Sequence, residues 1–126
     1  MFSHVMIGTN DLDRSKAFYD TVLALIGAKP GFVDGQRVFW RTPTGTFSVS
    51  RPINGESATH GNGATIGFLM DSPEQVDAFH AAAVANGGIS VENPPGWRDR
   101  PSKLYLAYFR DPDGNKICGL HRPASA

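Results

Sequence analysis

The residues that could do chemistry in this chain are few and lie far apart in the sequence. The only cysteine, Cys118, follows the turn in the stretch RDPDGNKICG at residues 110–119, and a histidine, His4, lies near the N-terminus. A cysteine whose thiol is activated by a histidine can act as a nucleophile, whereas an isolated cysteine is most often a small buried apolar residue. The sequence has no phosphate-binding loop, nucleophile elbow or catalytic pair of carboxylates. Any chemistry therefore depends on what the fold places around these two residues.

The composition narrows the class of protein. The 126 residues include 12 Lys and Arg and 12 Asp and Glu, so the formal net charge is zero. We therefore expect no nucleic-acid or membrane partner, because both favour a basic surface. One cysteine excludes an internal disulfide and fits a reducing compartment. With neither a signal peptide nor an apolar run of about 20 residues, the chain is expected to be a soluble cytoplasmic domain.

An internal repeat indicates how the chain is organised. The tripeptide AFY at residues 17–19 recurs as AFH at residues 78–80, an offset of 61 positions. The same offset relates residues typical of helix ends, which are Asp11 and Gly27 in the first copy and Ser72 and Gly88 in the second. Between these ends, apolar residues recur at helical spacing in both copies. The repeat predicts one helix in each half of the chain.

Strand-like segments surround each predicted helix. SHVMIGT and ATIGFLM precede the helices, and RVFWRT with TFSVSR, and LYLAYFR with NKICGLH, follow them. The turns at residues 41–45 and 110–114 share the pattern Arg-x-Pro-x-Gly, which is typical of β-turns. These patterns predict an α+β domain made of two βαβββ modules, residues 1–60 and 61–126. A cleft between the paired modules is a favoured place for a small ligand.

Three segments resemble the vicinal-oxygen-chelate superfamily, which includes glyoxalases, bleomycin-resistance proteins and extradiol dioxygenases. They are SHVMIGTNDLDRSKAFYDTVLALIGAKP, EQVDAFHAAAVANGG and YLAYFRDPDGNKICGL, and the turn Asp-Pro-Asp-Gly-Asn is the most specific part. The resemblance implies paired βαβββ modules that form a cup-shaped mixed sheet. It also implies one divalent metal in the cup, held by four side chains related by the repeat, and in many members a dimer.

The four positions that the resemblance assigns to metal ligands read His4, Val49, Thr65 and Cys118. Valine cannot bind a metal and threonine is a poor ligand for zinc, nickel or iron. A structural zinc site contributes about 10–16 kcal/mol over four ligands, so the loss of two strong ligands leaves little affinity. We expect a protein without a cofactor, in which His4 is the only matching ligand. An alternative is that His60, or an acidic residue of a partner chain, completes a site for a divalent metal.

Aromatic residues are the other candidates for the lining of the cup. Trp97 and Arg98 lie in a proline-rich loop, where an indole beside a guanidinium could hold a planar or anionic ligand. Tyr108 is a further aromatic candidate, and core packing is the competing explanation for about half of these aromatic residues. The expected ligand-binding residues are His4, Trp40, Phe47, Val49, Thr65, Trp97, Arg98, Tyr105 and Cys118.

These observations predict a glyoxalase-like protein, expected as a homodimer, that binds or transforms a small metabolite without the usual metal. One alternative is a metal-dependent lyase, isomerase or dioxygenase that uses His4. Another is a resistance-type protein that sequesters a drug. A third is an interaction module whose cleft is filled by its own side chains.

Overall fold

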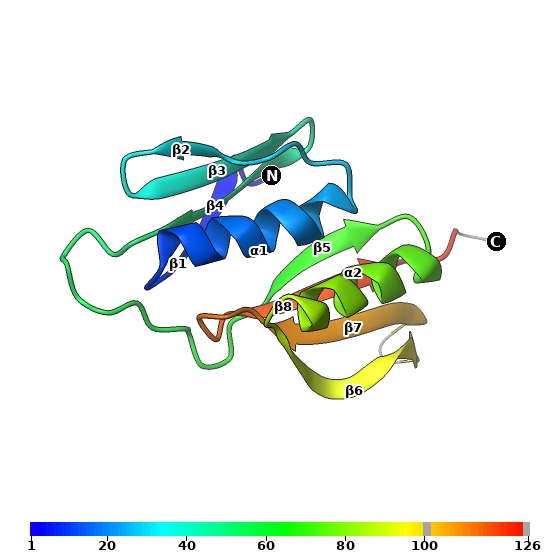
Figure 1. The fold of residues 1–126 in the computed structure, drawn as a ribbon. Coiled ribbons are helices and arrows are strands. Elements are labelled where there is room, and N and C mark those ends of the chain that lie inside the picture. Colours follow the sequence, from blue (N-terminus) through cyan, green and yellow to red (C-terminus); the bar gives the residue numbers. More distant parts are fainter. Residues whose placement is uncertain (100–101, 125–126) are drawn as a thin grey trace.

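The computed structural model describes residues 1–99 and 102–124, which form two βαβββ modules. The first module contains β1 (His4–Gly8), α1 (Leu12–Ala24), β2 (Phe32–Asp34), β3 (Arg37–Thr42) and β4 (Gly45–Ser50). The second contains β5 (Ile66–Met70), α2 (Pro73–Ala85), β6 (Ile89–Arg98), β7 (Leu104–Arg110) and β8 (Lys116–His121). The predicted α+β fold of two modules is confirmed, and Figure 1 shows the modules one above the other.

Local capping sets where both helices begin. Asp11 accepts a hydrogen bond from the backbone N–H of Arg14, and Ser72 accepts one from the N–H of Gln75. Each cap satisfies a backbone donor that has no partner within the helix. In the described part of the chain, neither helix combines the length and the apolar character needed to cross a membrane.

The end of α2 differs from the prediction by one residue. The glycine with a left-handed backbone is Gly87, with φ of 102°, whereas Gly88 was expected to close the helix. Gly88 has another reason to be glycine, because a Cβ there would lie 2.8 Å from the carbonyl oxygen of Ala83. In the first module Gly27, with φ of 84°, follows α1 as predicted.

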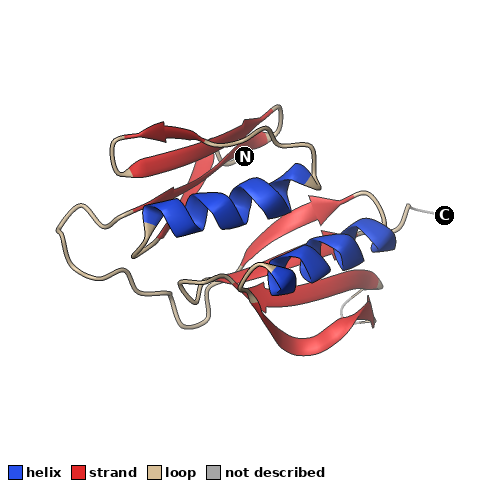
Figure 2. Ribbon diagram, in the orientation of Figure 1, coloured by secondary structure: helices blue, strands red, loops and turns tan. Residues whose placement is uncertain are grey.

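The strands form two four-stranded mixed sheets, in the orders β1-β4-β3-β2 (sheet A) and β5-β8-β7-β6 (sheet B). In each sheet one pair of strands is parallel, β1 with β4 and β5 with β8, and the other neighbours are antiparallel. Each helix packs on one face of its own sheet (Figure 2). The other face of each sheet carries no helix, and we call it the free face. Because side chains alternate along a strand, neighbouring residues point to opposite faces.

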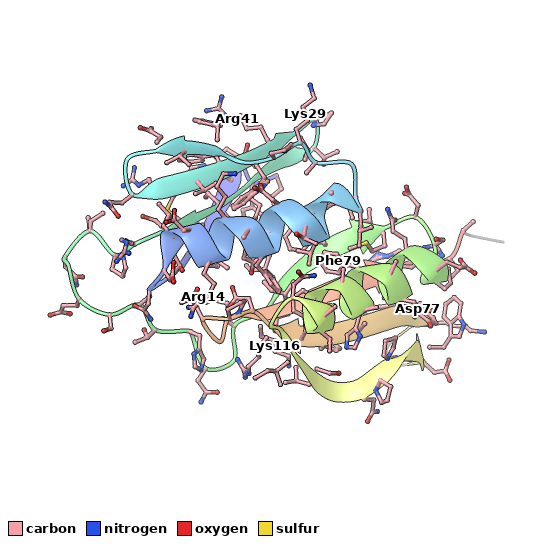
Figure 3. The ribbon with its side chains drawn as sticks, in the orientation of Figure 1. Arg14, Lys29, Arg41, Asp77, Phe79 and Lys116 are labelled. Carbon is pink, nitrogen blue, oxygen red and sulfur yellow. The ribbon has the colours of Figure 1, made fainter. Side chains whose placement is uncertain are left out.

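The two helix-covered faces converge on one hydrophobic core. Phe47 of sheet A contacts Phe68 of sheet B with ring centroids 5.3 Å apart, and Phe18 of α1 contacts Phe109 of β7 at 5.9 Å. Consequently the free faces of one chain point away from each other. Figure 3 shows Arg41, on the free face of sheet A, at the top of the molecule, and Lys116, on that of sheet B, in its lower half.

Candidate functional site

A cavity of about 520 Å³ lies between the edge strands of the two sheets, β1 and β5. Neither strand has a hydrogen-bonded neighbour on the side that faces the cavity. Four of the expected ligand-binding residues line it, namely His4, Trp40, Phe47 and Thr65. Its volume falls within the range of small-molecule sites, about 300–1,000 Å³. We call it the β1–β5 cavity and treat it as the candidate site.

Buried apolar side chains form most of the wall of the β1–β5 cavity. Leu23 and Ile26 at the end of α1 line it together with Phe47 and Phe68. Trp40 contributes its indole ring, which lies 5.8 Å from the ring of Phe47 between centroids. The apolar wall of the β1–β5 cavity is therefore continuous with the hydrophobic core that joins the modules.

A partly buried carboxylate holds the indole of Trp40 in place. Asp20 Oδ1 accepts hydrogen bonds from Trp40 Nε1 at 2.9 Å and from the backbone N–H of Gly31 at 2.7 Å, and Asp20 Oδ2 pairs with Lys16 Nζ at 2.6 Å. Partial burial on its own would raise the pKa of Asp20, but these hydrogen bonds outweigh it and lower the pKa. The wall at Trp40 is thus fixed by three donors to one carboxylate.

Hydroxyl groups and one imidazole form the polar end of the β1–β5 cavity. The hydroxyl of Thr42 donates to the carbonyl of Gly45 at 2.9 Å. The hydroxyl groups of Thr46 and Thr65 have no side-chain hydrogen bond to any other described residue. The Nδ1 atom of His4 contacts Ser3 Oγ at 2.8 Å, which leaves its Nε2 atom for a ligand. The segment RTPTGTF, residues 41–47, therefore contributes three threonines to the lining that the metal-ligand pattern does not predict. The repeated threonine is the sequence feature that could have indicated them.

A larger cleft, of about 850 Å³, lies at the opposite end of sheet A. Its lining includes Arg37, Arg51, Asp34 and Glu56, all exposed. Ordered apolar walls are what distinguish a ligand site from a hydrated groove. We therefore place the candidate site in the β1–β5 cavity.

The four positions assigned to metal ligands do not meet in one chain. Val49 is fully buried in the core beneath α1 and does not line the β1–β5 cavity. The strand register shows the cause: Met6 pairs with Ser48, and Gly67, 61 residues after Met6, pairs with Cys118. Ser48 is thus the repeat equivalent of Cys118. Aligning the turns instead of the strands shifted the assignment by one residue, and a shift of one residue moves a side chain to the other face.

Cys118 lies on the free face of sheet B, beside Tyr108 on the neighbouring strand. It is 4% exposed, and burial raises the pKa of its thiol to about 11. The thiol is therefore protonated at neutral pH, as expected for an inert buried cysteine. His4 lies on the other sheet, so the two residues do not form a nucleophile and base.

The donors of one chain do not fit a metal site. Within residues 1–99 and 102–124 no group of three His, Cys, Asp or Glu side chains is close enough to hold a metal ion. His60, the alternative ligand, lies against the turn at Gly114, where a Cβ would be 2.7 Å from its Nδ1 atom. A resident metal would need at least two more donors than His4, and at least one of them would have to come from outside the described residues.

Trp97, Arg98 and Tyr105 do not reach the β1–β5 cavity. Trp97 packs edge-on against Tyr105 with centroids 5.3 Å apart, and Tyr105 donates to Asp77 of α2 at 2.7 Å. Both rings therefore lie on the helix-covered side of sheet B. Arg98 points to the free face, where it donates to the carbonyl of Gly96 at 2.8 Å. Trp97 and Arg98 therefore point to opposite faces of sheet B, and neither lines the β1–β5 cavity.

The turn Asp-Pro-Asp-Gly-Asn has a structural role that joins the modules. Asp113 accepts hydrogen bonds from Thr9 Oγ1 at 2.7 Å and from Arg14 Nη2 at 2.9 Å, both in the first module. Asp111 accepts one from Tyr19 of α1 at 2.6 Å. Asn115 donates to the carbonyl of Gly8 at 3.0 Å. These hydrogen bonds across the module boundary explain why the turn requires Asp and Asn at these positions.

Comparisons with known proteins agree with this architecture. The sequence profile of the Glyoxalase/Bleomycin resistance protein/Dioxygenase superfamily matches residues 1–118. A glyoxalase/bleomycin resistance protein from Albidiferax ferrireducens is 63% identical, with a TM-score of 0.95, over 97% of this chain and 99% of that one. No match was found among curated proteins.

More distant structures share the fold alone. A lactoylglutathione lyase from Agrobacterium tumefaciens is 21% identical with a TM-score of 0.68, over 96% of this chain and 92% of that one. The fosfomycin resistance protein FosX from Mesorhizobium loti is 18% identical with a TM-score of 0.71, over 98% and 92%. The profile match and the 63% identical structure together show that the chain belongs to the glyoxalase/bleomycin resistance protein/dioxygenase superfamily.

Proposed function

We propose that this protein binds a small molecule in the β1–β5 cavity and does so without a resident metal. The supporting observation is the cavity itself, which joins an apolar wall to a polar end made of His4 and threonine hydroxyls. Such a combination buries the body of a ligand and orients one polar group. Sequestration of a metabolite or a drug requires no further chemistry. The single, buried Cys118 fits the cytoplasmic location that forms part of this proposal.

The protein acts as a homodimer in this proposal. Phe2 and Leu69, each 72% exposed, line the β1–β5 cavity, and Met6, farther along β1, is also exposed. A second chain packed against the unpaired edges of β1 and β5 would bury these side chains and close the cavity. It would also satisfy the edge hydrogen-bonding groups, which otherwise remain open to aggregation.

Filling the cavity tests the binding proposal. Ala28 lines the β1–β5 cavity, so an Ala28→Phe variant should abolish the thermal stabilisation that small-molecule ligands give to the wild-type protein. Ala81→Phe, at an exposed position of α2, is the matched control and should retain it. Equal ligand-induced shifts in both folded variants would place the binding elsewhere and refute the proposal.

Metal analysis tests the second half of the proposal. Protein purified without added metal should contain far less than one divalent ion per chain, because His4 belongs to no group of three metal-binding side chains within the described residues. A stoichiometric metal that is lost in a His4→Ala variant would instead favour a metal-dependent lyase, isomerase or dioxygenase completed by a partner chain.

A further inference from the structure

We infer that the part of the ligand that enters the β1–β5 cavity is uncharged, and that it is an apolar body with one neutral oxygen group, such as an alcohol or a phenol. This inference rests on the proposed function and names the class of ligand. It is independent of the overall charge of the chain, which is zero and favours neither sign.

The charge of the cavity lining carries the inference. The chain has 24 Asp, Glu, Lys and Arg residues (12 and 12), yet none of the described ones lines the β1–β5 cavity. His4 is the only titratable side chain there. Of the lining side chains, only a protonated His4 could pair with a carboxylate, and an ammonium group would find no carboxylate. Because burial of a poorly paired charge is strongly unfavourable, both ions are disfavoured in the interior relative to a neutral group.

The nearest cation on the neighbouring strand does not change this conclusion. Arg41 pairs with Thr46 across β3 and β4, so it starts close to the polar end of the cavity. Its guanidinium group lies over the ring of Phe32, 4.6 Å from the centroid, and Phe32 stacks on Phe39. The charge of Arg41 is thus directed toward β2 and away from His4, which lies on the other side of β4.

The free hydrogen-bonding groups select an oxygen atom on the ligand. Thr46 pairs with His4 on the adjacent strand, so the two side chains share a face and lie side by side. The Thr46 hydroxyl can donate or accept, as can that of Thr65, and His4 offers its Nε2 atom. One hydroxyl or carbonyl group of a ligand satisfies two of these groups at once. A purely hydrocarbon ligand would leave them without partners when it displaces water.

Four probes with one skeleton test the inference. They are 3-phenyl-1-propanol, propylbenzene, 3-phenylpropionate and 3-phenylpropylammonium, each titrated by NMR at pH 7.5. The alcohol should bind most tightly, the hydrocarbon about fivefold more weakly for loss of one hydrogen bond, and both ions at least about tenfold more weakly. An acid or amine that binds as tightly as the alcohol, in a way that Ala28→Phe abolishes, would overturn the inference and leave the proposed function standing. Failure of all four probes at millimolar concentration would overturn the inference.

A variant that keeps shape and removes one hydroxyl completes the test. Thr46→Val should narrow the difference in affinity between 3-phenyl-1-propanol and propylbenzene, because the alcohol loses a hydrogen-bond partner and the hydrocarbon no longer leaves the Thr46 hydroxyl unpaired. Thr21→Val is the matched control, because its hydroxyl bonds to the carbonyl of Ala17 on α1, and it should bind all probes as the wild type does. If Thr46→Val and Thr65→Val both leave the preference for the alcohol intact, the assignment of these hydroxyls is refuted.

Discussion

The hydroxyl of Tyr19 donates to Asp111 in the interior of the protein, at 2.6 Å and across the boundary between the modules. Burial, followed by the nearby charge of Asp111, raises the pKa of Tyr19 well above its usual value, so the hydroxyl is a donor at neutral pH. Burial also raises the pKa of Asp111, although hydrogen bonds from Tyr19 and Asn115 oppose this. The Asp111 carboxylate depends on these donors because water does not reach it.

We predict that Tyr19→Phe lowers the free energy of unfolding by about 1–3 kcal/mol, since it leaves a buried carboxylate with one donor fewer. Urea denaturation measures the change. The matched control is Tyr105→Phe, which removes a hydrogen bond to Asp77 at the surface and should cost about 0.5 kcal/mol. A smaller loss for Tyr19→Phe than for Tyr105→Phe would contradict the proposed role of the turn.

Cys118 gives a second prediction at the scale of one residue. With a thiol pKa of about 11 in place of 9.0, its thiolate fraction at pH 8 is about 100-fold lower than that of an unperturbed cysteine. Labelling of the native protein by iodoacetamide should be slower by at least this factor, and should accelerate only as the pH approaches 11. The urea-unfolded protein is the control. Native labelling as fast as that of the unfolded chain would show that the thiol is accessible and activated.

At the scale of the elements, Asp20 attaches α1 to β3 through the indole of Trp40. We predict that Asp20→Asn lowers the free energy of unfolding at pH 7 by about 1–2 kcal/mol, because hydrogen bonds to a charged acceptor are replaced by weaker ones. The pKa of Asp20 is lowered in the folded state, so its stabilisation is present above the unfolded pKa and is lost as the pH falls through the folded value. The difference between variant and wild type should therefore shrink below about pH 4. A difference that is constant between pH 7 and pH 3 in urea titrations would exclude this origin.

The elements also show what the sequence can and cannot predict. Capping by Asp11 and Ser72 is local, so both helix starts were predictable from residue types. The face to which a strand residue points depends on register, and a shift of one position aligned Val49, in place of Ser48, with Cys118. The same parity separates Trp97 from Arg98 although they are neighbours in the chain.

At the scale of the whole molecule, contacts between residues far apart in the sequence determine where the cavity forms. The contact between Phe47 and Phe68 determines that the helix-covered faces meet, and no local pattern encodes it. His4 and Thr65 nevertheless line one cavity as the repeat suggested, because the repeat places both at the start of an edge strand. Trp40 and Phe47 line it too, from the core side of sheet A. It was therefore easier to predict which residues lie near the cavity than to predict the face of the sheet to which each side chain points.

The unpaired edges of β1 and β5 lead to the last prediction. If a second chain covers them, a charge at Leu69 would be buried without a partner in the dimer. Leu69→Glu should therefore convert a dimer to a monomer, measured by light scattering after size exclusion, with little change in helix content. Ile53→Glu is the matched control, since Ile53 is 90% exposed and lies outside the β1–β5 cavity, and it should leave the dimer intact. A wild-type protein that elutes as a monomer, or a Leu69→Glu variant that remains dimeric, would show that these edges are not the subunit interface. The apolar side chains at the cavity mouth would then contact the ligand and not a second chain.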